Sequence, residues 1–598
     1  MKLSERIADW LAEHGIEQVF AVTGGGAMYL NQALGSHPGL RCTFMHHEQA
    51  CAMAAEGYAR ITGKPAVVMV TTGPGGINAL NGVFGAFTDS IPMLVISGQV
   101  KRETCLDYTP VPGLRQLGDQ EGPIIAMAKP ITKFAASVGS PAALAQLLPE
   151  ALLQATCGRP GPVWLDIPID IQAAECPPLP PATQPACRPP VTSTLPADCE
   201  QLWNLLNQSH RPLILAGTGV RLAGAEGALL DFVERHGIPL ATAWTHDLIA
   251  SDHPLFAGRP GTIGTRAGNF CIQNADLVLV LGSRLNIRQV SYNWGSFARN
   301  AKIVQVDIDP AELSKPLVRA ELRITADVAD FLSTLNENCI NNPLPDYTAW
   351  ADWCRSIRAR YPAFSAPLPT ERIHPYALVD RVFEQLRDDD LIVCGNASAC
   401  ILPFQIGKLR PRQRMFSNSG SASMGHDLPA SIGAALAAGS RRVVCFAGDG
   451  SLQMNIQELQ TLKTLGLNLV IVLINNEGYL SIRQTHENFF DRVIGATPAS
   501  GIEFPDFAKI ATAYGIPAVT IATHADLPIL DETLAKDGPA LIAVRVEPGI
   551  GFEPRIKSRV LPDGRFATPE LDDMYPFLPQ TELESLRHEA AQVRAAPR

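Results

Sequence analysis

The chain has 598 residues, of which 46% are hydrophobic and 18% charged, and this composition suits a soluble globular protein with large cores. A net charge of -10, without a long cationic run, argues against nucleic acid or an anionic membrane surface as a partner. No window reaches the ~20 consecutive apolar residues of a membrane span, and the N-terminus lacks an apolar signal core. The 13 cysteines include no CxxC pair, which predicts reduced thiols in a cytoplasmic protein and neither a disulfide framework nor a zinc site.

The chain begins with a predicted amphipathic helix and is then divided by two proline-rich stretches. Near the N-terminus, Leu3, Ile7, Trp10 and Leu11 recur at helical spacing. Dense prolines further along favour extended connectors. We therefore predict a first domain over 1–175, a linker over 176–197, a central domain over 198–337, a linker over 338–369, a third domain over 370–550, and a C-terminal arm over 551–598 that ends in a surface helix at 582–594.

In all three blocks, short β-branched and aliphatic runs alternate with helical patterns. This alternation is typical of parallel sheets that are covered by helices. The predicted fold class is therefore α/β, with three doubly wound parallel-sheet domains. The clearest strands are predicted at 66–70, 277–281, 303–307 and 391–394.

The strongest signal for chemistry is Gly448-Asp449-Gly450, followed by Asn475-Asn476. Apolar runs at 443–447 and 469–474 predict buried strands that end at these two groups, with a helix at about 454–465 between them. Open parallel sheets bind ligands at the carboxyl ends of their strands. A carboxylate and a side-chain amide, completed by diphosphate oxygens and water, suit Mg²⁺. Each group alone is an ordinary turn or loop start, but together they resemble the signature of thiamine diphosphate (ThDP) enzymes.

Further motifs extend this resemblance along most of the chain. The collinear set resembles the ThDP-dependent 2-keto acid decarboxylases and carboligases, and over 1–550 it is most similar to the catalytic (large) subunit of acetolactate synthase. The resemblance implies that the first block binds the aminopyrimidine ring, the central block a nucleotide such as FAD, and the third block diphosphate and Mg²⁺. It also implies a homodimer or homotetramer with active sites at the subunit interface, and it leaves open a small regulatory subunit. The motifs lie at 47–49, 54–60, 72–75, 158–162, 166–168, 423–425, 428–429 and 432–434.

The resemblance also assigns cofactor-binding residues. Glu48 would hydrogen-bond the pyrimidine ring and promote its imino form, which requires a dry pocket; the alternative is an ordinary helix glutamate. Met424 would be the apolar wedge that keeps ThDP bent, or a core methionine. Asp449, Asn476 and the backbone carbonyl of Gly478 would bind Mg²⁺. The other implied cofactor contacts are Pro74, Asn396, Ser398, Ser423, Gly448, Gly450, Ser451 and Tyr479.

Glycine-containing turns in the central block resemble, in order, the flavin-binding segments of acetolactate synthase. Glycines allow a backbone to approach a pyrophosphate, and acidic side chains can hold a ribose or flavin edge. The alternative is a vestigial fold that binds no flavin, and a bound flavin could be structural without a redox role. The implied FAD contacts are Gly217, Thr218, Gly219, Gly264, Thr265, Arg284, Asp307 and Asp327.

The residues expected around the second substrate depart from the family pattern. Gln120 matches a family glutamine near the reacting centre. Arg288 matches the arginine that receives the acceptor carboxylate, although a surface arginine would fit equally well. Thr485 replaces a tryptophan that narrows the pocket, Asp119 a phenylalanine, and Ile169 a lysine. We therefore hypothesise an unchanged cofactor core with a larger, more polar acceptor.

These features predict a ThDP- and Mg²⁺-dependent transferase or lyase of the acetolactate synthase type. The resemblance implies that it decarboxylates pyruvate and ligates the two-carbon carbanion to a second carbonyl compound, as in branched-chain amino acid biosynthesis. The alternatives are a carboligase with a larger acceptor such as a keto-sugar, a simple 2-keto acid decarboxylase, and a non-catalytic paralogue that acts as a scaffold. The presence of Glu48, Asp449 and Asn476 argues against the scaffold.

Overall fold

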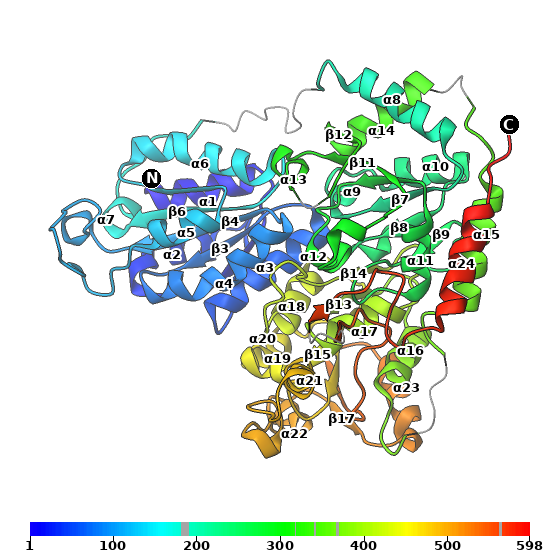
Figure 1. Cartoon of the computed structure of the whole chain (residues 1–598). Coiled ribbons are helices and arrows are strands. Elements are labelled where there is room, and N and C mark those ends of the chain that lie inside the picture. Colours follow the sequence, from blue (N-terminus) through cyan, green and yellow to red (C-terminus); the bar gives the residue numbers. More distant parts are fainter. Residues whose placement is uncertain (181–190, 317, 340–342, 366–369, 561–564, 598) are drawn as a thin grey trace. The chain divides into compact units, whose positions relative to one another are not determined.

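The computed structural model describes residues 1–180, 191–316, 318–339, 343–365, 370–560 and 565–597 (Figure 1). Both predicted linkers therefore include residues that lie outside the described ranges. The chain forms two compact units, each built from separate segments. The first comprises Met1–Cys187, Asp390–Ala399 and Ser417–Pro548, and the second comprises Arg188–Asp389, Cys400–Phe416 and Gly549–Arg598.

Three six-stranded sheets confirm the predicted α/β class. Their strand orders are β2-β1-β3-β4-β6-β5, β12-β11-β10-β7-β8-β9 and β14-β13-β15-β16-β18-β17. The pairings described within these sheets are parallel, and two short strands outside them, β19 (Arg559–Val560) and β20 (Phe566–Ala567), pair antiparallel. Within the described ranges, no helix is long and apolar enough to cross a membrane.

The first sheet carries helices on both faces. On one face, apolar residues of α1 (Leu3–Glu13), α2 (Met28–Ser36) and α6 (Pro141–Thr156) form a single core with alternate strand residues such as Val67 and Met69. Helices α3 (Glu48–Thr62) and α4 (Pro74–Asp89) pack on the same strands outside that core (Figure 1). The predicted N-terminal helix is confirmed, with its four apolar residues buried. The strands are β1 (Gln18–Ala21), β2 (Arg41–Phe44), β3 (Ala66–Val70), β4 (Met93–Gln99), β5 (Phe134–Ser137) and β6 (Pro162–Pro168).

The second sheet lies between two hydrophobic clusters. Helices α8 (Leu195–Gln208), α10 (Glu226–His236) and α14 (Val328–Cys339) contribute to one cluster, and α11 (Arg266–Asn274) and α15 (Thr348–Arg360) to the other. The C-terminal helix α24 (Gln580–Gln592) adds its buried face to the latter cluster, so it packs more closely than the surface helix we expected. The strands are β7 (Pro212–Ala216), β8 (Leu240–Thr242), β9 (Phe256–Gly258), β10 (Leu277–Leu281), β11 (Lys302–Asp307) and β12 (Leu322–Thr325).

In the third sheet, the helix that we predicted at 454–465 is broken. Helix α19 (Asp449–Met454) has Asn455 as its C-cap, and α20 begins only at Glu458 and ends at Leu465. Asn455 donates from Nδ2 to the backbone oxygen of Gly425 at 2.7 Å, and a side chain that bonds the backbone in this way competes with the helix. The strands are β13 (Leu391–Cys394), β14 (Arg414–Phe416), β15 (Val443–Gly448), β16 (Leu469–Asn475), β17 (Ala518–Ile521) and β18 (Ala540–Arg545).

A close helix crossing holds the first and third sheets in one unit. Helix α3 packs on α18 (Asp427–Ala437), and each helix places a glycine at the contact. A Cβ at Gly57 would lie 2.1 Å from the oxygen of Ala430, and a Cβ at Gly433 would lie 1.9 Å from the oxygen of Ala54. Only glycine allows the backbones to approach so closely. The sequence motifs around 57 and 433 therefore have a packing role in this chain.

The cysteines follow the prediction of reduced thiols only in part. Ten described cysteines are free, and all of them except Cys42 are buried. Cys157, in contrast, is disulfide-bonded. The prediction of reduced thiols is therefore wrong at Cys157.

Candidate cofactor site

The predicted metal and diphosphate residues gather at one edge of the third sheet. The strand order changes direction between β13 and β15, which makes the carboxyl ends of these strands the topological switch point. Asn396 and Ser398 follow β13, and Gly448 and Asp449 lie at the end of β15. Asn476 follows β16, the next strand in the sheet. The fold thus brings these residues to the place where open parallel sheets bind ligands.

Asp449 is a buried carboxylate that is held by backbone amides. Only 3% of it is exposed. Its Oδ1 accepts from the N–H of Gly450 at 2.7 Å, and its Oδ2 accepts from the N–H of Gly478 at 3.1 Å. Burial raises the pKa of Asp449 to about 6, although the amides act to lower it. No cationic side chain is among its described contacts, so a bound cation would compensate the charge.

Asn476 presents a buried oxygen that has no hydrogen-bond partner. Its Nδ2 donates to Ser398 Oγ at 3.2 Å, which fixes the orientation of the amide. The opposite atom, Oδ1, is buried and unpaired. Because buried polar atoms are normally satisfied, this oxygen is a candidate metal ligand. The described residues contain no group of three or more His, Cys, Asp or Glu, so amide, backbone and substrate oxygens would have to complete such a site.

The loop after β16 has a backbone that requires glycine at 478. Gly478 has φ +147°, and a Cβ there would lie 2.1 Å from the oxygen of Ala496. The preceding Glu477 has φ +58°, a left-handed conformation that is uncommon for residues other than glycine. Its N–H donates to Asn475 Oδ1 at 3.1 Å. This turn brings Asn476 and Gly478 to the carboxylate of Asp449.

The three residues expected at the diphosphate, Gly448, Gly450 and Ser451, differ from one another in their surroundings. A Cβ at Gly448 would meet no atom within 4 Å, so this turn faces open space. A Cβ at Gly450 would lie 2.2 Å from the ring of Tyr479, so packing alone requires glycine there. The hydroxyl of Ser451 already accepts from the N–H of Gly425 at 2.9 Å. Gly448 is therefore the residue of this group that leaves open space beside the end of β15.

The segment that carries Met424 lies against the same turns. Met424 itself is half-buried. The N–H of Ser423 donates to Asn418 Oδ1 at 3.2 Å, and Asn396 Nδ2 donates to the oxygen of Ala422 at 3.3 Å. Through Asn396, the turn after β13 is thus bonded to this segment.

Glu48 and Pro74 form a second group at the first sheet. They are the first residues of α3 and α4. Glu48 is half-buried, and its Oε2 accepts from Asn78 Nδ2 at 3.0 Å. The dry pocket that we expected around Glu48 is therefore not closed by the described part of this chain. None of the described hydrogen bonds joins Glu48 to Asp449 or Asn476.

Gln120 lies over the start of α4, close to Pro74. It is exposed and has φ +61°. A Cβ at Gly73 would lie 2.0 Å from the Gln120 oxygen, so glycine at 73 lets the loop approach the helix. The next residue, Glu121, accepts from the N–H groups of Leu117 and Gly118 at 2.9 and 3.1 Å. Gln120 thus joins the group that contains Glu48 and Pro74.

In the central block, several predicted flavin contacts lie at another switch point. The order of the second sheet changes direction between β7 and β10, and Gly217 to Gly219 follow β7. A Cβ at Gly217 would lie 2.5 Å from the oxygen of Gly282, the residue after β10. Thr218 donates to or accepts from Thr245 at 2.7 Å, and Arg284 is half-buried two residues after Gly282. The glycines here allow the two turns to touch.

The remaining predicted flavin contacts stabilise their own turns. Asp307 and Asp327 are 7% and 9% exposed, and each accepts from a backbone N–H two residues further on, at 3.0 and 2.8 Å. Thr265 caps α11 by accepting from the N–H of Gly268 at 3.1 Å. A Cβ at Gly264 would lie 2.2 Å from the oxygen of Arg259. These local contacts account for the presence of these residues without a bound nucleotide.

The two predicted acceptor residues are both exposed. Arg288 lies on α12 (Ile287–Val290) in the second unit. Thr485 lies on α21 (Leu480–Phe489) in the first unit, where its hydroxyl bonds the oxygen of Ser481 at 2.9 Å. The same helix exposes Ile482 and Phe489, at 46% and 57%. The surface around Thr485 is therefore partly apolar.

Sequence reasoning missed two residues that support the site. Asp427 is fully buried at the start of α18, and burial raises the pKa of its carboxyl. Its Oδ2 would lie 2.7 Å from a Cβ at Gly395, just after β13. Asn78, on α4, holds Glu48 as described above. A lone acidic residue at the start of an otherwise apolar helix was the only sequence signal for Asp427.

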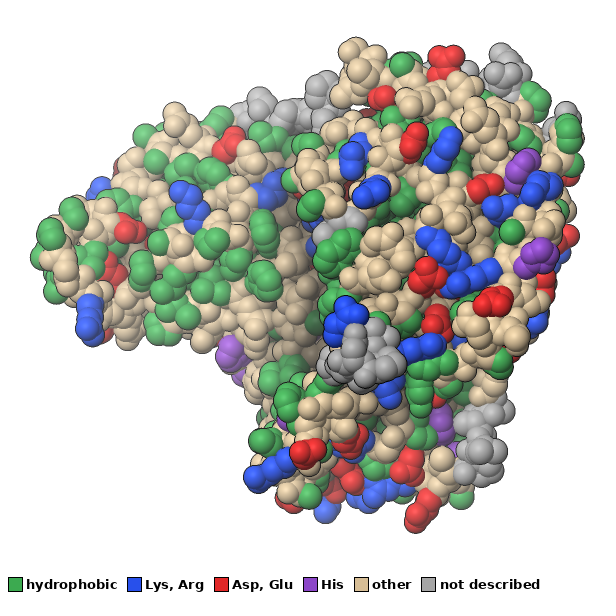
Figure 2. Space-filling model, viewed as in Figure 1, with side chains coloured by type: hydrophobic (Ala, Val, Ile, Leu, Met, Phe, Trp, Pro, Cys, Tyr) green, Lys and Arg blue, Asp and Glu red, His purple; other side chains and the backbone are tan. Residues whose placement is uncertain are grey.

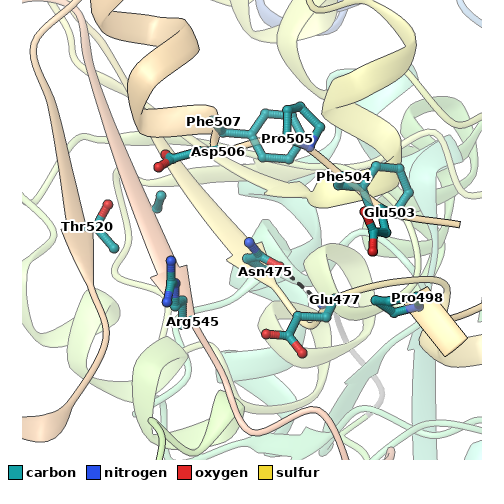
Figure 3. A pocket seen from close by; sticks show the side chains of 11 residues that line it. Asn475, Glu477, Pro498, Glu503, Phe504, Pro505, Asp506, Phe507, Thr520 and Arg545 are labelled. Carbon is teal, nitrogen blue, oxygen red and sulfur yellow. Dashed lines mark hydrogen bonds between the residues drawn. The ribbon is translucent and has the colours of Figure 1, made fainter.

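A cavity of about 300 Å³ lies beside the loop that follows β16 (Figure 3). In Figure 3, Arg545 and Glu477 both border it, and a hydrogen bond joins Asn475 to Glu477. Asn475 lines this cavity, whereas Gly448, Asp449 and Asn476 do not. The cavity is thus distinct from the candidate cofactor site. It is lined by Asn475, Glu477, Pro498, Glu503, Phe504, Pro505, Asp506, Phe507, Thr520, Ala543 and Arg545.

Family models match all three sheet-forming blocks. The N-terminal TPP binding domain of thiamine pyrophosphate enzymes matches residues 1–120, the central domain matches 199–335, and the C-terminal TPP binding domain matches 396–544. These matches place the Glu48 group in the N-terminal family domain. They place the Asp449 group in the C-terminal one.

Several curated proteins are similar over nearly the whole chain. The acetolactate synthase isozyme 1 large subunit of Escherichia coli is 34% identical over 552 residues, which cover 91% of this chain and 94% of that protein. The acetolactate synthase large subunit of Lactococcus lactis is 32% identical over 551 residues, covering 91% and 92%. The chloroplastic acetolactate synthase 2 of Zea mays is 32% identical over 565 residues, covering 91% and 85%.

Proposed function

Because this chain belongs to the thiamine pyrophosphate enzyme family, we propose that it is a ThDP- and Mg²⁺-dependent carboligase that decarboxylates pyruvate and joins the two-carbon unit to a second carbonyl compound. The similarity to acetolactate synthases and the family matches support a broader statement, that this chain is a ThDP-dependent transferase or lyase of this type. The observation that carries the proposal is that the switch point of the third sheet holds both the buried carboxylate of Asp449 and the unpartnered Oδ1 of Asn476.

The residues at this switch point fit a diphosphate with Mg²⁺. We assign the metal to Asp449, Asn476 and the carbonyl of Gly478, and the diphosphate to the open side of Gly448. When bound, ThDP supplies the electron sink for the decarboxylation. The Glu48 carboxyl would share a proton with the pyrimidine nitrogen, and Asn78 holds that carboxyl in place. Half-buried Met424 would support the cofactor from its apolar side.

We propose a homodimer or homotetramer, because one chain leaves the Glu48 group open to solvent. Helix α4 exposes Ile77, Phe84 and Phe87, at 43%, 42% and 36%, and these residues recur at helical spacing. In Figure 2, apolar side chains gather over this block of the chain. A second copy that covers α4 would exclude water from the neighbourhood of Glu48 and complete the dry pocket.

Two further assignments rest on the relatives. We propose FAD at the switch point between β7 and β10, where the turns of Gly217 and Gly282 meet. Several relatives are named large subunits, and a small regulatory partner is proposed for this chain by analogy. A role in branched-chain amino acid biosynthesis is proposed on the same basis.

The decisive experiment is product analysis with the purified full chain and pyruvate, in the presence of ThDP, Mg²⁺ and FAD. We expect CO₂ and acetolactate in near equal amounts. If CO₂ appears only after a bulky carbonyl such as a keto-sugar is added, the second candidate, a carboligase with a larger acceptor, is established; exposed Thr485 in place of a tryptophan favours it. Acetaldehyde as the sole product would indicate a simple decarboxylase. No turnover, together with no ThDP binding, would indicate a scaffold.

A further inference from the structure

A buried ion-pair network lies beneath the segment that carries Met424, and the proposed reaction does not use it. On α3, Arg60 donates from Nη2 to Glu56 Oε1 at 2.8 Å and to Asp89 Oδ2 at 2.6 Å. The side chains of Arg60, Glu56 and Asp89 are 9%, 0% and 8% exposed. A planar guanidinium bonds two carboxylates in fixed directions, which a flexible lysine ammonium cannot reproduce. Arg60 therefore fixes both carboxylates.

Besides Arg60, both carboxylates also contact the segment at 417–426. Asp89 Oδ1 accepts from the N–H of Gly420 at 3.0 Å. Glu56 Oε1 lies 3.3 Å from Nε2 of His426, the residue that precedes α18. A Cβ at Gly420 would lie 2.4 Å from Asp89 Oδ1, so no side chain fits there. The network thus fastens the segment on both sides of Met424.

The conformation of the segment depends on such anchors. Ala422 has φ +53°, an uncommon left-handed conformation that persists only when the surroundings impose it. The N–H of Ala422 donates to the oxygen of Asn418 at 2.7 Å, and the N–H of Ser423 donates to its side chain at 3.2 Å. Local bonds therefore shape the turn before Met424, while the hydrogen bond to Asp89 and the close approach of His426 to Glu56 set its place on α3 and α4.

We infer that Arg60 is a positioning residue that acts through Asp89 and Glu56 to place Met424 against the cofactor. The inference rests on the proposed function, in which Met424 contacts ThDP. Arg60 lies on the helix that begins with Glu48, and so one helix presents the proposed proton-sharing carboxylate and also locates a cofactor contact of the third block.

The test compares Arg60→Lys with wild type in the full-length protein. A matched control is Arg41→Lys, because Arg41 lies 3.6 Å from Glu17 on the surface, with both side chains more than half exposed. Two properties are measured: amide hydrogen exchange over 417–425 without cofactor, and the Kd for ThDP with Mg²⁺. Loss of a charge-assisted hydrogen bond predicts roughly 10- to 100-fold faster exchange and weaker ThDP binding for Arg60→Lys, and no change for the control.

A second variant covers the case in which Arg60→Lys does not fold. Gly420→Ala leaves the ion pairs intact but displaces the segment from Asp89, and the same changes are expected. Unchanged exchange and ThDP affinity in both variants, in a protein whose wild type binds ThDP, would overturn the inference. Faster exchange in the variants of a wild type that binds no ThDP would support the anchoring of the segment while refuting the proposed function.

Discussion

Replacing Gly433 with alanine would test the close crossing of α3 and α18. A Cβ at 433 would lie 1.9 Å from the oxygen of Ala54, whereas real Cβ contacts under 3.0 Å are essentially never seen. The helices would have to separate by roughly 1.1 Å, the difference between these distances. Overpacking of this kind costs about 1–3 kcal/mol, and we expect the first unit to lose about 2 kcal/mol of its free energy of unfolding.

The measurement is the midpoint of urea-induced unfolding, together with the ThDP affinity. Gly227→Ala is the control, because Gly227 lies in α10 and a Cβ there would meet no atom within 4 Å. It should leave the midpoint unchanged or raise it, since alanine favours helix over glycine by up to ~1 kcal/mol of free energy. If Gly433→Ala behaves like this control in both measurements, the reasoning about the crossing is refuted.

Three other perturbations test the site and its support. Asn476→Ala should weaken Mg²⁺-dependent ThDP binding, measured by calorimetry, by about 100-fold, whereas Asn204→Ala, at an exposed position of α8, should not; equal losses would contradict the metal assignment. Glu48→Gln should lower kcat with pyruvate at least ~100-fold with little change in ThDP affinity, and normal turnover would remove Glu48 from the mechanism. The pKa of Glu56 is lowered from its ordinary 4.5 to about 2: burial opposes this shift, but His426 and Arg60 outweigh it. Glu56 therefore stabilises the fold above pH ~4.5 by about 3 kcal/mol, and this is lost as the pH falls through ~2. Unfolding of Glu56→Gln should show a shallower pH dependence over that range, and an identical slope would contradict the coupling.

The fold could be predicted because it depends on local patterns. The strand at 66–70 was placed at its observed bounds, since an apolar run between turn residues has few alternatives in an α/β chain. The helix after Asp449 could not be placed correctly. Its break at Asn455 depends on a bond to Gly425, which is distant in sequence.

The candidate site could be predicted only in outline. Asp449 and Asn476 were recognised from their spacing, but the unpaired Oδ1 of Asn476 and the open side of Gly448 depend on three-dimensional packing. Gly450 looked like a ligand-facing glycine, yet the ring of Tyr479 occupies the space of its side chain. A glycine in a motif therefore does not reveal by itself whether a ligand or a neighbouring residue requires it.

The interleaved composition of the two units has a consequence for biosynthesis. The first unit needs segments from both 1–187 and 417–548, and the second needs the last 50 residues, 549–598. Leu583, Leu586 and Ala590 of α24 belong to the core that also contains residues of β7 and β10. Domains usually fold as they leave the ribosome, from the N-terminus onward. Here the second unit cannot complete its core until α24 has been synthesised, so a nascent chain must keep that exposed apolar surface from aggregating until this helix leaves the ribosome.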